Sequence, residues 1–425
     1  MNEKLLQFIW QFQYFNKKNL TTVDGTSLHI IHTGFANTNQ GPDFLEAKIK
    51  IGNTTWAGNI EIHTQSSEWN NHRHTADINY RNVILHVVWQ NDMPIKDING
   101  QTIAALELQN LVPKIMLQQY DQLMRAKGFV PCENYLPALS EMGWLSWKER
   151  LVAERLQLKA ETVLLNLKQS NNHWEEVFWW MLAKNFGIKV NADVFEQIAK
   201  SIPVNILAKH KNQVNQLEAL LLGQSGLLAG SFDEDYPKLL QREYHFLAAK
   251  YKLKAIGKAP DFLRMRPANF PTVRLAQLAM LVFQSTHLFS KVLELKEISG
   301  IRKLLDVTAN DYWHYHYTFD EATAFKPKNL GRLMTDNIII NTVVPVLFAY
   351  GIHHKEQHWK DTAVNFLSVL PAEQNAITKQ WKAKNVSNEN ALDSQALIGL
   401  KNNYCNFKHC LNCAVGNKIL KNAEL

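Results

Sequence analysis

The sequence predicts an α+β protein with a mixed-sheet N-terminal lobe over residues 1–135 and a large all-helical C-terminal lobe over residues 136–425. Apolar runs typical of strands are concentrated before about residue 110, whereas apolar residues at helical spacing dominate after about residue 139. The chain has no repeat at a solenoid period and no low-complexity linker. The boundary near residue 135 is therefore placed by a change of pattern.

The first lobe is expected to begin with a helix and to continue with strands. Apolar residues at helical spacing predict a helix over residues 4–15, and Asp24-Gly25 predicts a hairpin turn that leads into a strand at 28–31. Residues 45–51 alternate between apolar and charged side chains, which predicts a half-buried strand. The inward residues of this strand are expected to be Leu45, Ala47, Ile49 and Ile51.

A second strand is expected to return from a turn at Gly52-Asn53. Over residues 56–63, Ile60 and Ile62 would face the core, while Glu61 and His63 share the opposite face. The nearly unbroken apolar run at 83–89 predicts a central strand buried on both faces. The remaining elements expected in this lobe are a short helix after Ser66-Ser67, a strand at 102–108 and a helix at 111–124.

The second lobe is predicted to be helical throughout. Helical periodicity covers residues 147–167, 174–186, 216–222, 239–251, 273–283, 336–350, 359–370 and 395–404. The most apolar stretch, 338–350, contains Asn341, Thr342 and Pro345 and is shorter than the ~20 residues of a membrane span. A buried helix is the expectation there.

Composition excludes several classes of protein. Because 46% of the 425 residues are hydrophobic, the chain can bury a sizeable core and is neither disordered nor fibrous. Four cysteines argue against a disulfide framework and indicate a reducing compartment. Residues 1–15 lack the apolar core of a signal peptide, so we expect a cytoplasmic protein without a membrane partner. The formal net charge of +7 is a mild bias toward polyanions such as nucleic acid.

Two acidic residues are expected to converge at adjacent strand ends. Asp43 opens one strand of the predicted hairpin and Glu61 lies on the other, so both carboxylates can reach one divalent cation. Mg²⁺ prefers oxygen ligands and keeps waters that can act as nucleophiles. His63 is placed to act as a general base or as a cation near the scissile group. The alternative is structural, because Pro-Asp at a strand entrance and Glu on a hairpin are both ordinary.

The order helix, strand, Pro42-Asp43, hairpin, Glu61-x-His63, helix, strand resembles the restriction-endonuclease-like core, whose signature is PD-(D/E)xK. In that superfamily the acidic residues bind Mg²⁺ and the Lys positions or deprotonates water. The resemblance implies a Mg²⁺-dependent nuclease with Asp43 and Glu61 as metal ligands. His63 replaces the Lys, and a neutral imidazole lacks the permanent charge of an ammonium. A non-catalytic nucleic-acid-binding or scaffold protein, and a hydrolase of smaller phosphate esters, therefore stay as alternatives.

A second resemblance covers the whole chain and implies no activity. The sequence is similar to an uncharacterised bacterial family, domain of unknown function 2851. The motifs that carry this similarity are Gly-Pro-Asp-Phe at 41–44, Asn-Ile-Glu-Ile-His at 59–63, Val-Ile-Leu-His-Val-Val at 83–88, Arg-Pro-Ala-Asn-Phe-Pro at 266–271 and Arg-Leu-Ala-Gln-Leu-Ala at 274–279.

The cysteines form a second candidate metal site. Cys405, Cys410 and Cys413 lie within nine residues, and Cys132 follows Pro131 near the lobe boundary. One remote and three local thiolates can bind tetrahedral Zn²⁺ or an iron–sulfur cluster. The spacing is similar to plant-type ferredoxins and to helicase-associated nucleases that hold a cluster, although the lone Cys stands elsewhere in both. The alternative is that Cys410 and Cys413 pack inward as small apolar residues.

Several other polar residues admit a plainer interpretation. His72 and His74 could both reach a metal from a loop or contact phosphate. Because no Cys or Glu stands at a zinc-like spacing, we favour the interpretation that they cap and orient the short helix. His86 lies in an apolar strand and is interpreted as a core histidine. Arg266 and Arg274 flank a proline-bounded turn, where they either hold phosphate at a helix start or form ion pairs.

Overall fold

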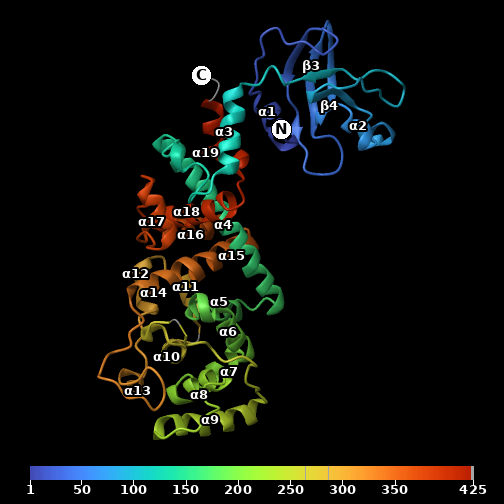
Figure 1. The fold of residues 1–425 in the computed structure, drawn as a ribbon. Coiled ribbons are helices and arrows are strands. Elements are labelled where there is room, and N and C mark those ends of the chain that lie inside the picture. Colours follow the sequence, from blue (N-terminus) through green and yellow to red (C-terminus); the bar gives the residue numbers. More distant parts are fainter. Residues whose placement is uncertain (264, 286, 423–425) are drawn as a thin grey trace. The chain divides into compact units, whose positions relative to one another are not determined.

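The computed structural model describes residues 1–263, 265–285 and 287–422 (Figure 1). The chain divides into two compact units. Unit 1 comprises Met1–Trp147, Lys379–Val386 and the chain from Ile398 onward, and unit 2 comprises Lys148–Thr378 and Ser387–Leu397. The amino-acid pattern suggested a single boundary near residue 135, and only the proposed grouping of Cys132 with Cys405, Cys410 and Cys413 implied that the C-terminal segment returns to the first unit.

The α+β class is confirmed: a mixed sheet lies in the N-terminal part, and the C-terminal part is mostly helical. The sheet order is β1-β3-β4-β5-β6, with β2 paired to β3. Strands β1 to β4 pair antiparallel, whereas β5 runs parallel to both β4 and β6. The strands are β1 (Leu28–His32), β2 (Phe35–Ala36), β3 (Phe44–Ile51), β4 (Thr54–Gln65), β5 (Val83–Gln90) and β6 (Ala105–Glu107).

A β-bulge changes the expected alternation at the start of β3. The register slips between Phe44 and Ala47, and Glu46 has a φ of 58°. The extra residue turns Leu45 outward, so the expectation that it faces the core is wrong, while Phe44 is buried instead. From Ala47 onward the predicted inward positions hold, since Ala47 and Ile49 are buried.

Close strand approach explains one glycine on β4. A Cβ at Gly58 would lie 2.6 Å from the carbonyl oxygen of Asn82 and 2.5 Å from the side chain of Ile84. Only glycine allows the chain entering β5 to approach β4 this closely. The resulting parallel register places Glu61 opposite His86.

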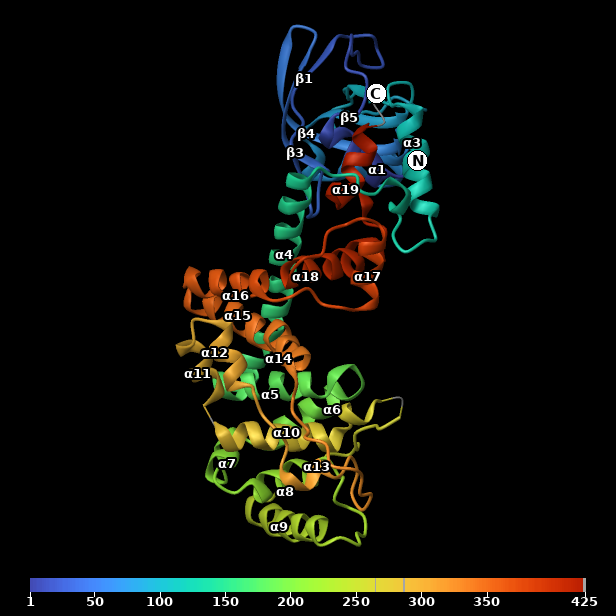
Figure 2. The same ribbon diagram turned by 90° about the vertical axis from the view of Figure 1, so that its left-hand side faces the viewer.

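Helices from both ends of the chain pack within unit 1. Helix α1 (Glu3–Phe12) contacts β4, and α19 (Ala414–Lys421) lies beside α3 (Lys114–Arg125) (Figure 2). The Tyr14 hydroxyl donates to the Asn417 side chain at 2.8 Å. The remaining helical elements assigned wholly or partly to unit 1 are α2 (Glu68–Asn71), η1 (His74–Ala76), η2 (Ile78–Tyr80), η3 (Glu133–Tyr135), α4 (Glu141–Gln169), α17 (Ala376–Ala383), α18 (Ala391–Gly399), η6 (Leu400–Cys405) and η7 (Cys410–Asn412).

Unit 2 is built around α10 (Pro271–Gln284), whose sequence is apolar on nearly every side and which contacts α5 and α8. The other elements are α5 (Trp174–Phe186), α6 (Ile188–Ser201), α7 (Val204–Lys209), α8 (Val214–Gln224), α9 (Asp235–Tyr251), η4 (Pro267–Asn269), α11 (Leu288–Glu294), α12 (Ile298–Leu304), α13 (Asp311–His314), α14 (Arg332–Ile338), η5 (Ile339–Val343), α15 (Val344–His354) and α16 (Gln357–Val369).

The buried helix expected at 338–350 is present as α14, the π-helical turn η5 and α15. Pro345 follows the π-helical turn, because a proline inside a helix removes one backbone hydrogen bond and crowds the preceding turn. In the described part of the chain, the continuous helix Arg332–His354 is long and apolar enough to cross a membrane. Since 72% of its most apolar window is buried within the protein, this is weak evidence for a span.

Candidate metal centre in unit 1

Asp43 and Glu61 lie side by side at the paired ends of β3 and β4. The Asp43 backbone N–H donates to Glu61 Oε2 at 3.1 Å, and the Ile62 N–H donates to Asp43 Oδ2 at 3.0 Å. Gln7 of α1 also donates to Asp43 Oδ1 at 2.9 Å. The two carboxylates that the sequence singled out are thus brought together, and each bonds the backbone at the other's position.

Two histidines lie beside the free oxygen of Glu61, and two more contact the first of them. Glu61 Oε1 lies 3.5 Å from His63 Nε2 and 3.4 Å from His74 Nε2. His63 Nε2 is 3.2 Å from His72 Nδ1, and His63 Nδ1 is 2.8 Å from His86 Nε2. The structure therefore places His63 beside Glu61, as the sequence indicated, and adds three imidazoles to which the sequence analysis gave a plainer role.

A turn with a left-handed residue delivers His72 and His74 to the same place. Helix α2 ends at Asn71, and Arg73 adopts a φ of 61° before η1 begins at His74. This reversal brings the rings of His72 and His74 to a centroid separation of 5.3 Å. Sequence separation alone did not indicate that these two rings lie together, because side chains two residues apart on a regular helix point in different directions.

The histidines form a compact group of potential ligands. One nitrogen each from His63, His72 and His74 lies within 4.8 Å of the others, the only such group of three or more His, Cys, Asp or Glu in the described part of the chain. The Nε2 atom of His74 is buried and accepts or donates no hydrogen bond. The polar atom beside this nitrogen is Glu61 Oε1, at 3.4 Å. A buried imidazole nitrogen without a hydrogen bond is unfavourable in a protein interior, and a metal ion would satisfy it.

Burial controls the charge of the cluster. Desolvation lowers the pKa of His63 to about 4 and that of His86 to about 3, so both are neutral near pH 7. Neutral imidazole is the form that binds metals. Burial, together with the charge of Glu3 and, for Asp43, that of Glu61, raises the pKa of Asp43 and of Glu61 above the usual carboxyl range. Without a cation, these carboxylates resist ionisation.

Aromatic rings enclose one side of the cluster and leave another open. Tyr80 stacks on His74 with centroids 3.8 Å apart, and Trp69 meets His74 and His86 edge to face or tilted at 5.3 and 5.4 Å. His63 is 1% exposed, whereas His72 is exposed to solvent. A small ligand or a substrate group can therefore approach from the His72 side.

The side chains of the cluster provide both oxygen and nitrogen donors for a metal ion. Mg²⁺, the ion expected from the sequence, prefers oxygen ligands, which here come from Asp43 and Glu61. Imidazole nitrogens suit first-row transition ions such as Mn²⁺, Fe²⁺ and Zn²⁺. Glu61 Oε1 lies within 3.5 Å of ring nitrogens of His63 and His74, and Asp43 lies beside Glu61. The cluster thus offers oxygen and nitrogen donors to a divalent cation.

The four cysteines also gather in unit 1. Each is unpaired with any other cysteine, and Cys132, Cys410 and Cys413 are buried. Burial raises the pKa of Cys132 and of Cys410 to about 12, and charge on neighbouring cysteines adds to the effect. For Cys405 the same causes raise the pKa, with contributions from all three of the others. The four sulfurs are therefore close enough to influence one another electrostatically.

Local contacts hold the C-terminal cysteines. Cys413 occupies the N-cap position of α19. Burial raises the pKa of its thiol, and the nearby backbone of Gly416 and Val415 and the Trp147 side chain partly oppose this effect. Gly416 packs against the carbonyl of Cys410 so closely that a Cβ could not fit there. All four cysteines belong to the described residues, yet no three of their sulfurs lie within 4.8 Å of one another.

One comparison with known proteins gives a result. A family model described as "Protein of unknown function (DUF2851)" matches residues 3–376. No curated protein and no solved structure matches the chain significantly.

Proposed function

The chain belongs to this family of unknown function, and from the geometry around Asp43 and Glu61 we propose that it is a metal-dependent nuclease that hydrolyses phosphodiester bonds. The observation that carries the proposal is the convergence of Asp43 and Glu61 with His63 at adjacent strand ends. Hard oxygen donors beside a neutral imidazole are the groups that metal-assisted hydrolysis requires.

The arrangement of elements supports the same proposal. The antiparallel β3–β4 pair carries the two carboxylates, α2 follows, and β5 returns parallel to β4. This order is the one that the resemblance to the restriction-endonuclease-like core implies, and we propose that fold for the N-terminal part. The net charge of +7 favours a polyanionic substrate over a small neutral one.

Each residue has a distinct role in the proposed reaction. A divalent cation held by Asp43, Glu61, His72 and His74 would polarise a phosphoryl oxygen and acidify a water molecule. Glu61 is oriented by the Asp43 N–H, which leaves Oε1 directed at the imidazoles. His63 is neutral and is held by His86, so it is able to accept a proton from the attacking water. His86 acts as a positioning residue because it touches only other protein groups of the cluster.

The test is cleavage of plasmid DNA, single-stranded DNA and RNA with Mg²⁺, Mn²⁺ or Zn²⁺. We expect hydrolysis that depends on the divalent ion and that falls in Asp43→Asn and Glu61→Gln. Glu46→Gln is the matched control, because Glu46 is an exposed acidic residue on β3. Hydrolysis that persists at full rate in both site variants would overturn the proposal.

One observation favours a non-catalytic alternative. Both carboxylates already accept backbone hydrogen bonds, and such bonds fasten strand ends whether or not a metal is bound. A protein that retains this fold but not the chemistry would bind polynucleotides in a salt-dependent manner without hydrolysing them. Binding in EDTA, with no cleavage under any metal, would establish this alternative.

We propose in addition that Cys132, Cys405, Cys410 and Cys413 bind an iron–sulfur cluster. Four thiolates on one Zn²⁺, each at about 2.3 Å, would lie within about 4 Å of one another. The wider separation of these sulfurs suits a cluster, whose cysteines attach to different iron atoms. Free thiols also agree with the reducing conditions of the cytoplasm, where we propose that the protein acts.

Anaerobic purification tests the cluster independently of nuclease activity. We expect stoichiometric iron and acid-labile sulfide, with visible absorption that Cys413→Ser and Cys132→Ser both abolish. Protein that holds one zinc ion and no iron would replace the cluster with a structural Zn²⁺ site. Absence of both metals would reject the metal site altogether.

A further inference from the structure

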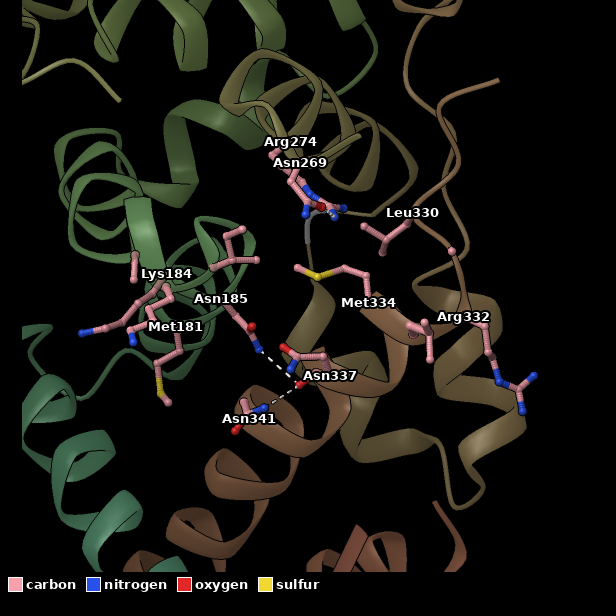
Figure 3. A pocket seen from close by; sticks show the side chains of 15 residues that line it. Met181, Lys184, Asn185, Asn269, Arg274, Leu330, Arg332, Met334, Asn337 and Asn341 are labelled. Atoms are coloured by element: carbon pink, nitrogen blue, oxygen red, sulfur yellow. Dashed lines mark hydrogen bonds between the residues drawn. The ribbon is translucent and has the colours of Figure 1, made fainter. Parts of the chain in front are cut away.

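Unit 2 contains an open pocket of about 840 Å³ whose polar lining is basic or neutral (Figure 3). It is formed by residues of α5, α6, η4, α10 and α14, by Asn341 of the π-helical turn η5, and by Leu330 and Gly331 before α14. The charged side chains that line it are Lys184, Lys189, Arg274 and Arg332, and no carboxylate is among the lining residues. This composition favours an anionic ligand.

Arg274 is the most informative residue of this lining. Its side chain belongs to α10 and is only 6% exposed. The guanidinium donates to the amide oxygens of Gln277 at 2.9 Å and of Asn269 at 2.5 Å, while its Nε atom has no hydrogen-bond partner. Both bonded partners are neutral, so they leave the positive charge uncompensated.

Such an arrangement is costly without an anion. A buried charge is normally paired with an opposite charge, because removal from water costs several kcal/mol. No carboxylate in the described part of the chain lies within 4.0 Å of the Arg274 guanidinium, although unit 2 pairs other arginines in this way. Arg302, for example, bonds Asp336 at 2.7 Å. In Figure 3, Arg274 and Asn269 lie together at one end of the pocket.

The other cations of the pocket differ in availability. Lys184 already pairs with Glu196 at 2.7 Å, and Arg332 lies 3.5 Å from Asp336. Lys189 is exposed and forms no ion pair within 4.0 Å among the described residues. Arg274 and Lys189 are therefore the two cations of this lining that are left to neutralise a ligand.

The uncharged residues of the pocket lining indicate what the ligand contains besides an anionic group. Asn185 and Asn341 donate to the backbone of Asn337, which fixes their amides at the pocket wall (Figure 3). Met334 and the 84% exposed Leu333 provide apolar surface at the same pocket. Fixed amides and apolar contacts suit a flat, partly polar ring, and a guanidinium suits phosphate.

We propose that this pocket binds a nucleoside phosphate, with its phosphate group against Arg274. The volume of about 840 Å³ is within the range of pockets that hold such small molecules. The proposal does not depend on the nuclease proposal, since all of the residues that it uses belong to unit 2.

The experiment is calorimetric titration with ATP and with inorganic pyrophosphate, in EDTA, using full-length Asp43→Asn protein. EDTA and the substitution exclude a contribution from the metal centre and from hydrolysis. We expect saturable ATP binding that weakens at least tenfold in Arg274→Gln and severalfold in Lys189→Gln. Lys254→Gln is the matched control, because Lys254 is exposed, belongs to unit 2 and does not line the pocket.

The outcomes separate clearly. No saturable ATP binding up to millimolar concentration, or equal affinity in Lys189→Gln and Lys254→Gln, would overturn the proposal. Should Arg274→Gln fail to fold by circular dichroism, the comparison between the two lysine variants still decides. Pyrophosphate that binds as tightly as ATP would overturn the assignment to a nucleoside.

Discussion

Buried polar groups in the two units lack opposite partners. In unit 1, Glu61 lies beside His63 and His74, Asp43 lies beside Glu61, and the cluster offers electron pairs without a positive charge nearby. In unit 2, Arg274 is buried among neutral amides and has no negative partner within the described residues. The first arrangement is suited to a cation and the second to an anion. Burial alone therefore does not predict which ligand a site binds. The ligand is predicted by whether the buried group that lacks a partner donates electron pairs or carries a positive charge.

The largest expected effect separates the two units by function. Glu61→Gln should lower cleavage at least about 100-fold, because it removes a ligand oxygen, and should leave ATP affinity unchanged. Arg274→Gln should weaken ATP binding at least tenfold and leave the rate of cleavage unchanged. Cleavage rate and ATP affinity measured on both variants check this prediction, and a single variant that changes both quantities would show that the two sites are coupled.

The scaffold of the metal centre should be sensitive to Trp69. This side chain is 1% exposed, packs with Ile95 and Ile103, and contacts His74 and His86. Trp69→Ala should lower the free energy of unfolding by about 3–5 kcal/mol, since it leaves a large cavity. Urea denaturation measures the loss, with the 48% exposed Trp56→Ala as the control on β4. A change below about 1 kcal/mol for Trp69→Ala would contradict the packing argument.

Glu218 extends the comparison, because it is a buried carboxyl in unit 2 whose hydrogen-bond donors are neutral side chains and whose Oε1 has no hydrogen-bond partner in the described part of the chain. Its Oε2 accepts hydrogen bonds from Tyr236 and Trp313, and burial raises its pKa to about 7 from 4.5. Between pH 4.5 and 7 the folded state holds a proton that the unfolded state has released. The contribution of Glu218 to stability therefore falls as pH rises through this window and is constant above it.

Glu218→Gln should remove this pH dependence. The amide keeps an oxygen for the two donors but cannot ionise. We expect the variant to gain on the order of 1–3 kcal/mol over the wild type at pH 8 relative to pH 5, measured as the difference in urea midpoints. Parallel pH profiles for the two proteins would show that Glu218 titrates normally in the fold.

The smallest effect is expected on the surface of α3. Arg125 lies 2.9 Å from Asp121, but the two side chains are 80% and 54% exposed. Arg125→Ala should change the free energy of unfolding by less than about 0.5 kcal/mol, because solvent screens exposed pairs. A loss of more than 1 kcal/mol in urea denaturation would contradict this.

The sequence anticipated those parts of the metal centre that follow strand periodicity. Alternation on β4 places Glu61 and His63 on one face, and the hairpin brings Asp43 beside them. The contribution of His72 and His74 depends on the left-handed conformation of Arg73, which no short pattern reveals. The outward turn of Leu45 likewise follows from a bulge, since one extra residue reverses the alternation.

The helical part was predictable in class but not in its charged details. The distribution of apolar residues indicated α5 and α10, both of which are buried on most sides. Whether Arg274 would hold phosphate or form an ion pair depended on which acids come near it in space. Which acidic residues come near Arg274 is determined by tertiary packing between segments that are distant in the sequence. Local sequence patterns therefore do not predict them.

The return of the chain to unit 1 has a consequence for biosynthesis. Cys132 and the Cys405–Cys413 segment are separated by roughly 270 residues, most of which form unit 2. At ribosomal rates of about 5–20 residues per second, Cys132 waits roughly 15–50 seconds for its companions to emerge. During this interval the first unit lacks the contact between α19 and α3. The face of α3 that α19 covers in the folded protein, and the Cys132 thiol, therefore wait for the C-terminal segment to be made.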